Sequence, residues 1–412
     1  MEIKVGGLAL GHPSDNLEAI FEKALSSPHL FRNHDALRSD YVPDHLPFRD
    51  DQITSVANVL SPLLHSSRPS NLLIYGKTGT GKTAATKHVL SKLETTSKKN
   101  NIQASFVYSN VRISGTEYRV LAELAAQIGM AVPFTGLAVS EVLSRIQSQI
   151  KTRKLHAVFV LDEIDYLVKL FGDGLLYDLT SSSDAIAPGF LSLIGISNDL
   201  QFKEELGARV LSRLSEEEIV FPPYTAQELT TILHERAKFA FNPGTYSDAA
   251  VNLCAALSGS EHGDARRAVD LLRITGEVAE REGAKELDDK HVRIALQKID
   301  QDRISDALKS LPLHAKLVLI AVVKNSAESG TNKSSGTVYE HYSNLCKGSG
   351  MEALTTRRVS GLITELDTLG LVSATLVNYG RYGRTKKVVP QISQDVLRQA
   401  FQSDGAVSQL IV

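Results

Sequence analysis

The feature that most constrains this chain is a glycine-rich loop between an apolar run and a helical pattern. The loop, Gly76-Lys77-Thr78-Gly79-Thr80-Gly81-Lys82-Thr83, directly follows Leu72-Leu73-Ile74-Tyr75. The apolar run predicts a buried strand, and the glycines allow backbone N–H groups to turn toward phosphate oxygens. Lysine and threonine at the end of such a loop can reach the β and γ phosphates and bind Mg²⁺. The residues expected at the phosphates are Gly76, Thr78, Gly79, Thr80, Gly81, Lys82, Thr83 and Ala84.

Polar residues end two further apolar runs. Asp162 and Glu163 follow Val158-Phe159-Val160-Leu161, and Asn198 follows the run near Leu193. Ligands of open α/β sheets lie at the carboxyl ends of the strands, so these side chains are expected beside the loop. Asp162, together with Thr83, is predicted to hold Mg²⁺, and Glu163 to polarise the water that attacks a phosphate. Asn198 is either a phosphate or water contact or an ordinary turn residue.

Three arginines are candidates for stabilising charge on a transferred phosphoryl group. Arg209 and Arg213 lie four residues apart, and Arg266 follows Gly263-Asp264-Ala265 at the start of a helical pattern. Arginine can act on phosphate within one chain or from a neighbouring subunit. Taken singly, Arg209 and Arg213 are better explained as residues of a solvated basic face, and the alternative for Arg266 is a surface arginine.

The order of apolar patterns divides the chain into three regions. Strands are predicted at 72–75, 104–108, 157–161 and 190–196. Helices are predicted from near Asp50 to 64 and at 82–94, 116–129, 140–151 and 201–206. Alternating strands and helices favour a mainly parallel sheet. Pro222-Pro223-Tyr224 breaks this pattern, and a capping box at Thr225 and Glu228 begins an all-helical stretch to about 300. The third region has helices at 313–323, 337–346 and 355–369, then a hairpin with strands at 371–377 and 385–391.

Charge is distributed unevenly along the 412 residues. The net formal charge is −2, from 45 Lys/Arg and 47 Asp/Glu; residues 301–412 hold 13 and 9 of these, a net of +4, which leaves −6 for residues 1–300. No run approaches the ~20 apolar residues that span a bilayer. We expect no secretory signal, and the two cysteines, far apart, suggest a reducing compartment and no metal site. The expected location is cytoplasmic, at the nucleoid.

The basic C-terminal region predicts a DNA-binding surface. In the helix from Thr355 the apolar residues share one face, and the other face is basic at its start and then small or hydroxylated. A glycine-containing basic hairpin follows, which could enter a groove or contact phosphates. An alternative is a protein-binding module with solvated lysines. The DNA-contact candidates are Arg357, Arg358, Ser360, Thr364, Arg381, Arg384, Lys386 and Lys387.

The order of these motifs resembles the AAA+ ATPases. That resemblance implies that Lys82 and Thr83 form the Walker A pair and that Asp162 and Glu163 form Walker B. It also implies that Asn198 is sensor 1, that Arg266 is sensor 2, and that Arg209 or Arg213 is the arginine finger.

From about residue 30 to its end the chain is similar to the archaeal origin-recognition initiators of the Orc/Cdc type. Tyr41-Val42-Pro43 and Leu46-Pro47-Phe48-Arg49 resemble the family segment that packs on adenine, which implies base contacts by Val42, Pro43, Phe48 and Arg49. Asn110-Val111-Arg112 and Thr116 to Leu121 resemble the family's insertion, which implies DNA contacts by Arg112, Tyr118 and Arg119. Residues 171–189 depart from the pattern, and Ser182 and Ser183 there could belong to a loop.

The resemblance implies a fold and a function. The expected domains are an N-terminal extension (1–30), an α/β P-loop domain of AAA+ type (31–222), an α-helical lid (223–300) and a winged helix (301–412). The expected function is that of an initiator that binds ATP or ADP with Mg²⁺ and double-stranded origin DNA. Slow hydrolysis would act as a switch in a monomer that assembles on DNA, with paralogous initiators and a replicative helicase as partners. Alternatives are a clamp-loader-like ATPase, an ATP-gated transcription regulator and a signalling NTPase.

Overall fold

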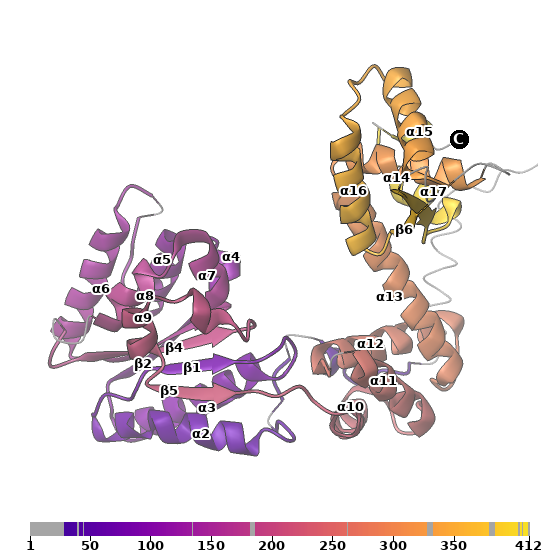
Figure 1. Cartoon of the computed structure of the whole chain (residues 1–412). Coiled ribbons are helices and arrows are strands. Elements are labelled where there is room, and N and C mark those ends of the chain that lie inside the picture. The colour runs from indigo at the N-terminus through magenta and orange to yellow at the C-terminus, as the bar shows by residue number, and fades with distance from the viewer. Residues whose placement is uncertain are drawn as a thin grey trace, which may run out of the picture. The chain divides into compact units, whose positions relative to one another are not determined.

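The computed structural model describes residues 29–38, 41–43, 45–133, 135–181, 186–261, 263–327, 333–378, 384–402, 404–405 and 407–410. At Glu261, Asn378 and Arg384 it describes only the backbone. The chain forms two compact units that divide between Val292 and Arg293. Figure 1 shows the elements of each unit. Among the described residues, no helix combines the length and the apolar character needed to cross a bilayer.

The first unit contains a five-stranded parallel sheet in the order β2-β3-β4-β1-β5. Its central strands are buried on both faces because their residues are almost all apolar. In register, Asp162 at the end of β3 pairs with Asn110 of β2 and Ile196 of β4. The strands are β1 (Leu72–Tyr75), β2 (Ala104–Asn110), β3 (His156–Asp162), β4 (Phe190–Ser197) and β5 (Glu217–Val220).

Helices cover both faces of this sheet. Figure 1 shows α2 and α3 on one face and α5 to α9 on the other, and a separate apolar core lies under each set. The helices are α2 (Asp50–Leu60), α3 (Lys82–Lys99), α4 (Val111–Ser114), α5 (Glu117–Gln127), α6 (Val139–Arg153), α7 (Ile164–Phe171), α8 (Gly174–Ser181) and α9 (Ala208–Leu214), with short 3₁₀ helices at His34–Leu37, Ser61–His65 and Phe202–Glu205.

The four predicted strands of this region are confirmed, two predicted helices need correction, and several short elements were not predicted. The helix expected from near Asp50 to 64 begins at Asp50 as predicted but ends at Leu60, and a 3₁₀ helix that contains Pro62 follows at Ser61–His65. The helix expected over 201–206 is a 3₁₀ helix. β5 and the short α4, α7, α8 and α9 were not predicted, since β5 is acidic and mostly exposed and a helix of two turns has too few apolar positions to show a period.

An all-helical lid completes the first unit, as predicted. Thr225 and Glu228 form the expected capping box at its first helix. Residues 29–38 pack on it: Leu30 N donates to Glu280 Oε1 at 2.9 Å, and Phe31 stacks on Phe241. The expected boundary at residue 300 falls inside the last helix. The lid helices are α10 (Ala226–Ala240), α11 (Asp248–Glu261), α12 (Ala265–Glu282) and the start of α13 (Asp289–Ser310).

The second unit is a winged helix with its own apolar core. That core contains Tyr342, Phe401 and the buried side chains of the helix Leu313–Ala327. The predicted helices and antiparallel hairpin are confirmed, and one C-terminal helix was not predicted. The elements are α14 (Leu313–Ala327), α15 (Ser335–Gly348), α16 (Thr356–Thr368), β6 (Val372–Asn378), β7 (Arg384–Pro390), α17 (Gln394–Phe401) and a 3₁₀ turn at Ser408–Leu410.

Candidate functional site

The glycine-rich loop connects β1 to α3 and curls around the ammonium of Lys82. Gly79 and Gly81 have φ of +73° and +91°, which glycine adopts most readily. Lys82 Nζ donates to Gly76 O at 2.7 Å and to Lys77 O at 2.8 Å, and only 4% of the residue is exposed. Burial lowers the pKa of Lys82 to about 8, against the opposing field of Asp162 and with a contribution from Arg266. The loop therefore holds a cation where a phosphate cradle needs one.

The carboxylate of Asp162 is held in place from three sides. Thr83 Oγ1 and Tyr108 OH each donate to Oδ2 at 2.7 Å, and the N–H of Glu163 donates to Oδ1 at 2.9 Å. Burial and Asp162 raise the pKa of Tyr108, so the phenol remains a donor. Tyr108 was not predicted, because only the pairing of β2 with β3 brings it to Asp162. Thr83 and Asp162 offer the hydroxyl and carboxylate oxygens that Mg²⁺ takes together with phosphate oxygens.

Glu163 lies beside Asp162 in a left-handed conformation with φ of +57°. Its carboxylate contacts Arg112 Nη1 at 3.8 Å and accepts from Asn110 Nδ2 at 3.5 Å. Both partners belong to the segment that resembles an insertion, and Arg112 itself is largely exposed. The predicted DNA contact Arg112 therefore lies at the nucleotide site.

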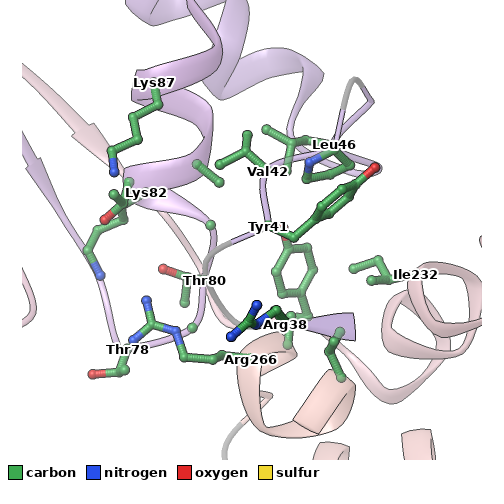
Figure 2. A pocket seen from close by; sticks show the side chains of 18 of the residues that line it. Arg38, Tyr41, Val42, Leu46, Thr78, Thr80, Lys82, Lys87, Ile232 and Arg266 are labelled. Atoms are coloured by element: carbon green, nitrogen blue, oxygen red, sulfur yellow. The ribbon is translucent and has the colours of Figure 1, made fainter. Parts of the chain in front are cut away.

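A cavity of about 650 Å³ brings together most of the predicted nucleotide residues. Figure 2 shows that Lys82, Lys87 and Thr78 lie toward one side and Tyr41, Leu46 and Ile232 toward the other. The cavity thus has a polar and an apolar part, as a nucleotide requires. The predicted residues that line it are Val42, Pro43, Thr78, Gly79, Thr80, Gly81, Lys82, Thr83, Ala84, Arg112, Asp162, Glu163, Asn198 and Arg266.

Three of the residues expected at the nucleotide do not line this cavity: Gly76, Phe48 and Arg49. Only 2% of Arg49 is exposed, and its guanidinium stacks 3.7 Å from the ring centre of Tyr224. Arg49 Nε donates to Thr80 O at 2.8 Å, Nη1 to Phe48 O at 2.8 Å and Nη2 to Pro222 O at 2.6 Å. The structure thus corrects the expected base contact: Arg49 is buried between the loop and Tyr224, outside the cavity.

The two candidate finger arginines, both on α9, have different surroundings and do not line the cavity. Arg213 Nη1 donates to Ser181 Oγ, and its guanidinium lies 5.5 Å from the ring centre of Tyr177. Arg209 is exposed. Tyr177 and Ser181 belong to α8, inside the atypical stretch 171–189, whereas Ser182 and Ser183 lie outside the described residues.

In the second unit, α16 presents the predicted DNA face. Arg357, Arg358 and Thr364 are exposed, and Ser360 is partly exposed. The Thr364 hydroxyl donates to Ser360 O at 3.0 Å and accepts from Lys386 Nζ at 2.7 Å, which joins helix and hairpin. The only hydrogen of the Thr364 hydroxyl is therefore already engaged in a hydrogen bond within the protein. Lys387 is exposed, Arg381 lies outside the described residues, and only the backbone of Arg384 is described.

The loop before α16 is held by two tyrosines that were not predicted. Leu354 N donates to Tyr342 OH at 3.0 Å, and Tyr339 OH donates to Leu354 O at 3.2 Å. His314 Nδ1 lies 2.8 Å from the same Tyr342 hydroxyl. The orientation of α16 is thus set by the buried core of its own domain.

The remaining insertion residues differ from each other. The Tyr118 hydroxyl donates to Pro133 O and its ring packs against the apolar core, so Tyr118 contributes to packing within the domain. Arg119 is exposed on α5.

Three family models match the chain in order: an AAA domain at residues 65–201, the Cdc6 AAA+ ATPase-type lid domain at 230–297, and the CDC6 C-terminal winged helix domain at 306–400. An ORC1-type DNA replication protein of Thermococcus kodakarensis is 46% identical over 401 residues, 96% of this chain and 97% of that protein. One from Pyrococcus horikoshii is 45% identical, with 96% of each chain covered. Among solved structures, the Aeropyrum pernix Orc1 protein in complex with DNA has a TM-score of 0.79 and 44% identity, covering 92% of this chain and 99% of that one.

Proposed function

The chain belongs to the archaeal Orc/Cdc6 family of AAA+ replication proteins, and we propose from this that it is an initiator that binds double-stranded origin DNA under the control of a bound nucleotide. The observation that carries the proposal is that one chain holds both a cavity lined by the glycine-rich loop and a winged helix whose helix α16 begins with two exposed arginines. Neither a plain ATPase nor a plain DNA-binding module needs both.

The DNA would lie against α16 and the hairpin. Arg357 and Arg358 are positioned at the start of α16, where side chains of a recognition helix meet base edges or phosphates. Lys386 and Lys387 on β7 would contact the backbone, and Arg381 and Arg384 are proposed for the adjoining hairpin tip. Support comes from the similar Aeropyrum pernix Orc1 protein, whose solved structure is a complex with DNA.

The cavity would hold ATP or ADP with Mg²⁺. Thr83 and Asp162 would hold the metal. When bound, the metal neutralises the charge of the phosphates and orients them. Glu163 would orient the attacking water, while Asn198 and Arg266 would contact the phosphates. A finger, Arg209 or Arg213, would come from a neighbouring subunit, so hydrolysis would be slow in a monomer and would serve as a switch.

The hydrolysis step is tested with Glu163→Gln. We expect single-turnover hydrolysis to fall by ~10²-fold or more, the usual contribution of a positioned base, with ATP affinity little changed. The control is Glu204→Gln, an exposed residue away from the cavity. Equal hydrolysis by the two variants would remove Glu163 from this role.

We also propose paralogous initiators and the replicative helicase as partners, and the nucleoid as the place of action. The first experiment is fluorescence anisotropy with duplexes from candidate origins and with scrambled duplex, at physiological salt, with ATP, ADP or no nucleotide. A preference of ~10³-fold or more for one duplex is expected of a specific binder. Weak, salt-sensitive binding to every duplex would contradict the proposal and favour a clamp-loader-like or signalling ATPase. Mapping the preferred duplex to a promoter would favour a transcription regulator.

A further inference from the structure

We propose that Arg49 is a positioning residue that joins the phosphate-binding loop to the segment 221–225, which connects β5 to the first lid helix and is called the hinge below. Arg49 makes this connection through backbone carbonyls and the ring of Tyr224. Nucleotide occupancy of the loop would thereby be transmitted to residues 221–225 and to the start of α12. This inference rests on the nucleotide binding proposed above, and it adds a route by which the lid senses the nucleotide.

The first step is the contact with the loop. Arg49 Nε donates to the carbonyl of Thr80 at 2.8 Å. In a trans peptide the C=O and the following N–H point in opposite directions. By holding the Thr80 carbonyl from behind, Arg49 therefore fixes the direction of the Gly81 N–H, one of the donors of the phosphate cradle. No side chain could be added at Gly81 without crowding, since a Cβ there would lie 3.0 Å from the Tyr224 hydroxyl.

The second step is the contact with the hinge. Pro222 lies between β5 and α10, and its carbonyl accepts from Arg49 Nη2 at 2.6 Å. The Tyr224 ring lies against the guanidinium, and Tyr224 N donates to Gly263 O at 3.2 Å, just before α12. One planar guanidinium therefore spans the loop, the hinge and, through Tyr224, the lid.

The lid also contacts the loop directly. The N–H of Ala265 donates to Gly79 O at 3.2 Å. A Cβ at Gly79 would lie 1.6 Å from Asp264 Oδ1, so the α12 N-terminus is packed on the loop backbone. Two successive peptide units of the loop, after Gly79 and after Thr80, are thus oriented from behind by the lid and by Arg49. A change in the conformation of the loop therefore changes the contacts that the lid and Arg49 make with it.

The chemistry of Arg49 fits this role better than that of lysine. Its donors form a rigid fork that can reach carbonyls of different segments at once, whereas the lysine ammonium is a single point. The planar group also stacks on tyrosine. An Arg49→Lys variant keeps the positive charge but loses the simultaneous hydrogen bonds to the carbonyls of the loop and the hinge.

The test is amide hydrogen exchange on the full chain, with and without Mg²⁺–ATP or Mg²⁺–ADP. In the wild type we expect nucleotide to slow exchange about tenfold at 221–228 and 263–266, within the usual range of coupling between sites. In Arg49→Lys this response should fall to within about twofold while ATP still binds, because Lys82 and Thr83 remain. Arg273→Lys, a lid arginine paired with Asp270 and Glu277, is the matched control and should respond as the wild type does.

The outcomes separate this inference from the proposed function. A wild type that binds no nucleotide would overturn the proposed function. A wild type that binds nucleotide without slower exchange at the hinge, or an Arg49→Lys variant that responds fully, would overturn the role of Arg49 alone. If Arg49→Lys does not fold, Tyr224→Leu decides: a reduced response at 263–266 supports the inference, and a full response overturns it.

Discussion

The nucleotide site and the DNA-facing surface of the winged helix both rely on cations, but in opposite settings. Lys82 and Arg49 are 4% and 2% exposed and donate to backbone carbonyls. Arg357, Arg358 and Lys387 are exposed to solvent. A buried cation with fixed partners is preorganised, and its loss leaves polar groups unpaired. An exposed cation is already hydrated, so its contribution to binding is smaller and depends on salt.

The largest effect is therefore expected at Lys82. Lys82→Ala should cost about 2–5 kcal/mol of ATP binding, about 30-fold or more in Kd, as expected when one partner of a buried charge pair is removed. Lys77→Ala is the matched control, since the Lys77 side chain is exposed and only its carbonyl contacts Lys82. Titration with a fluorescent ATP analogue measures both. ATP affinity at the wild-type level in Lys82→Ala would mean that the site is wrongly assigned.

Next in size is Arg357. If Arg357 reads a base, Arg357→Ala should weaken binding to the preferred duplex by about 1–3 kcal/mol and relax the preference at one position. Arg398→Ala on α17 is the comparison variant from the same domain. Anisotropy with single-base variants of the duplex gives the answer. Unchanged affinity would take Arg357 off the recognition surface.

How much of the site the sequence could reveal depends on how far apart along the chain the interacting residues lie. The loop, Asp162 and Glu163 were predictable because each motif is local and its chemistry depends on neighbours in the chain. Arg49 was misplaced because its decisive partner, Pro222, is 173 positions away. Tyr108 was missed for a similar reason: its bond to Asp162 spans 54 positions and requires knowing that β2 pairs with β3.

The fold shows a similar limit. Long amphipathic helices were found from their period and buried strands from short continuous apolar runs, because packing against a core enforces both patterns. The helices α7, α8 and α9 have seven or eight residues, too few for a clear period. β5 begins within a run of successive glutamates, 216 to 218, and is identified only by its pairing with β1.

A third prediction uses the pH dependence of nucleotide binding. Burial lowers the pKa of Lys82 to about 8. A bound phosphate raises it again, so binding takes up a proton above pH 8, where ADP is already fully ionised. Affinity for ADP should be level below about pH 8 and then fall by up to about tenfold per pH unit, as the ammonium is lost.

Calorimetry in two buffers of different ionisation enthalpy measures the proton taken up. Lys77→Ala should give the wild-type profile, because the Lys77 side chain is not part of the cavity. Binding without proton uptake at about pH 8.5 would show that the Lys82 ammonium is not desolvated as its surroundings require.

The smallest effect is expected at Lys387, on the exposed side of the comparison. A phosphate contact carries no sequence information, so Lys387→Ala should weaken binding to preferred and scrambled duplexes alike, by a few-fold at physiological salt. The slope of log K against log salt should fall in magnitude by about 1, as one fewer phosphate is neutralised. Lys386→Ala makes the comparison sharper, because Lys386 Nζ donates a hydrogen bond to Thr364 and its loss also removes this link between the hairpin and α16. A loss confined to the preferred duplex in Lys387→Ala would contradict a phosphate contact and place this exposed lysine among the residues that read sequence.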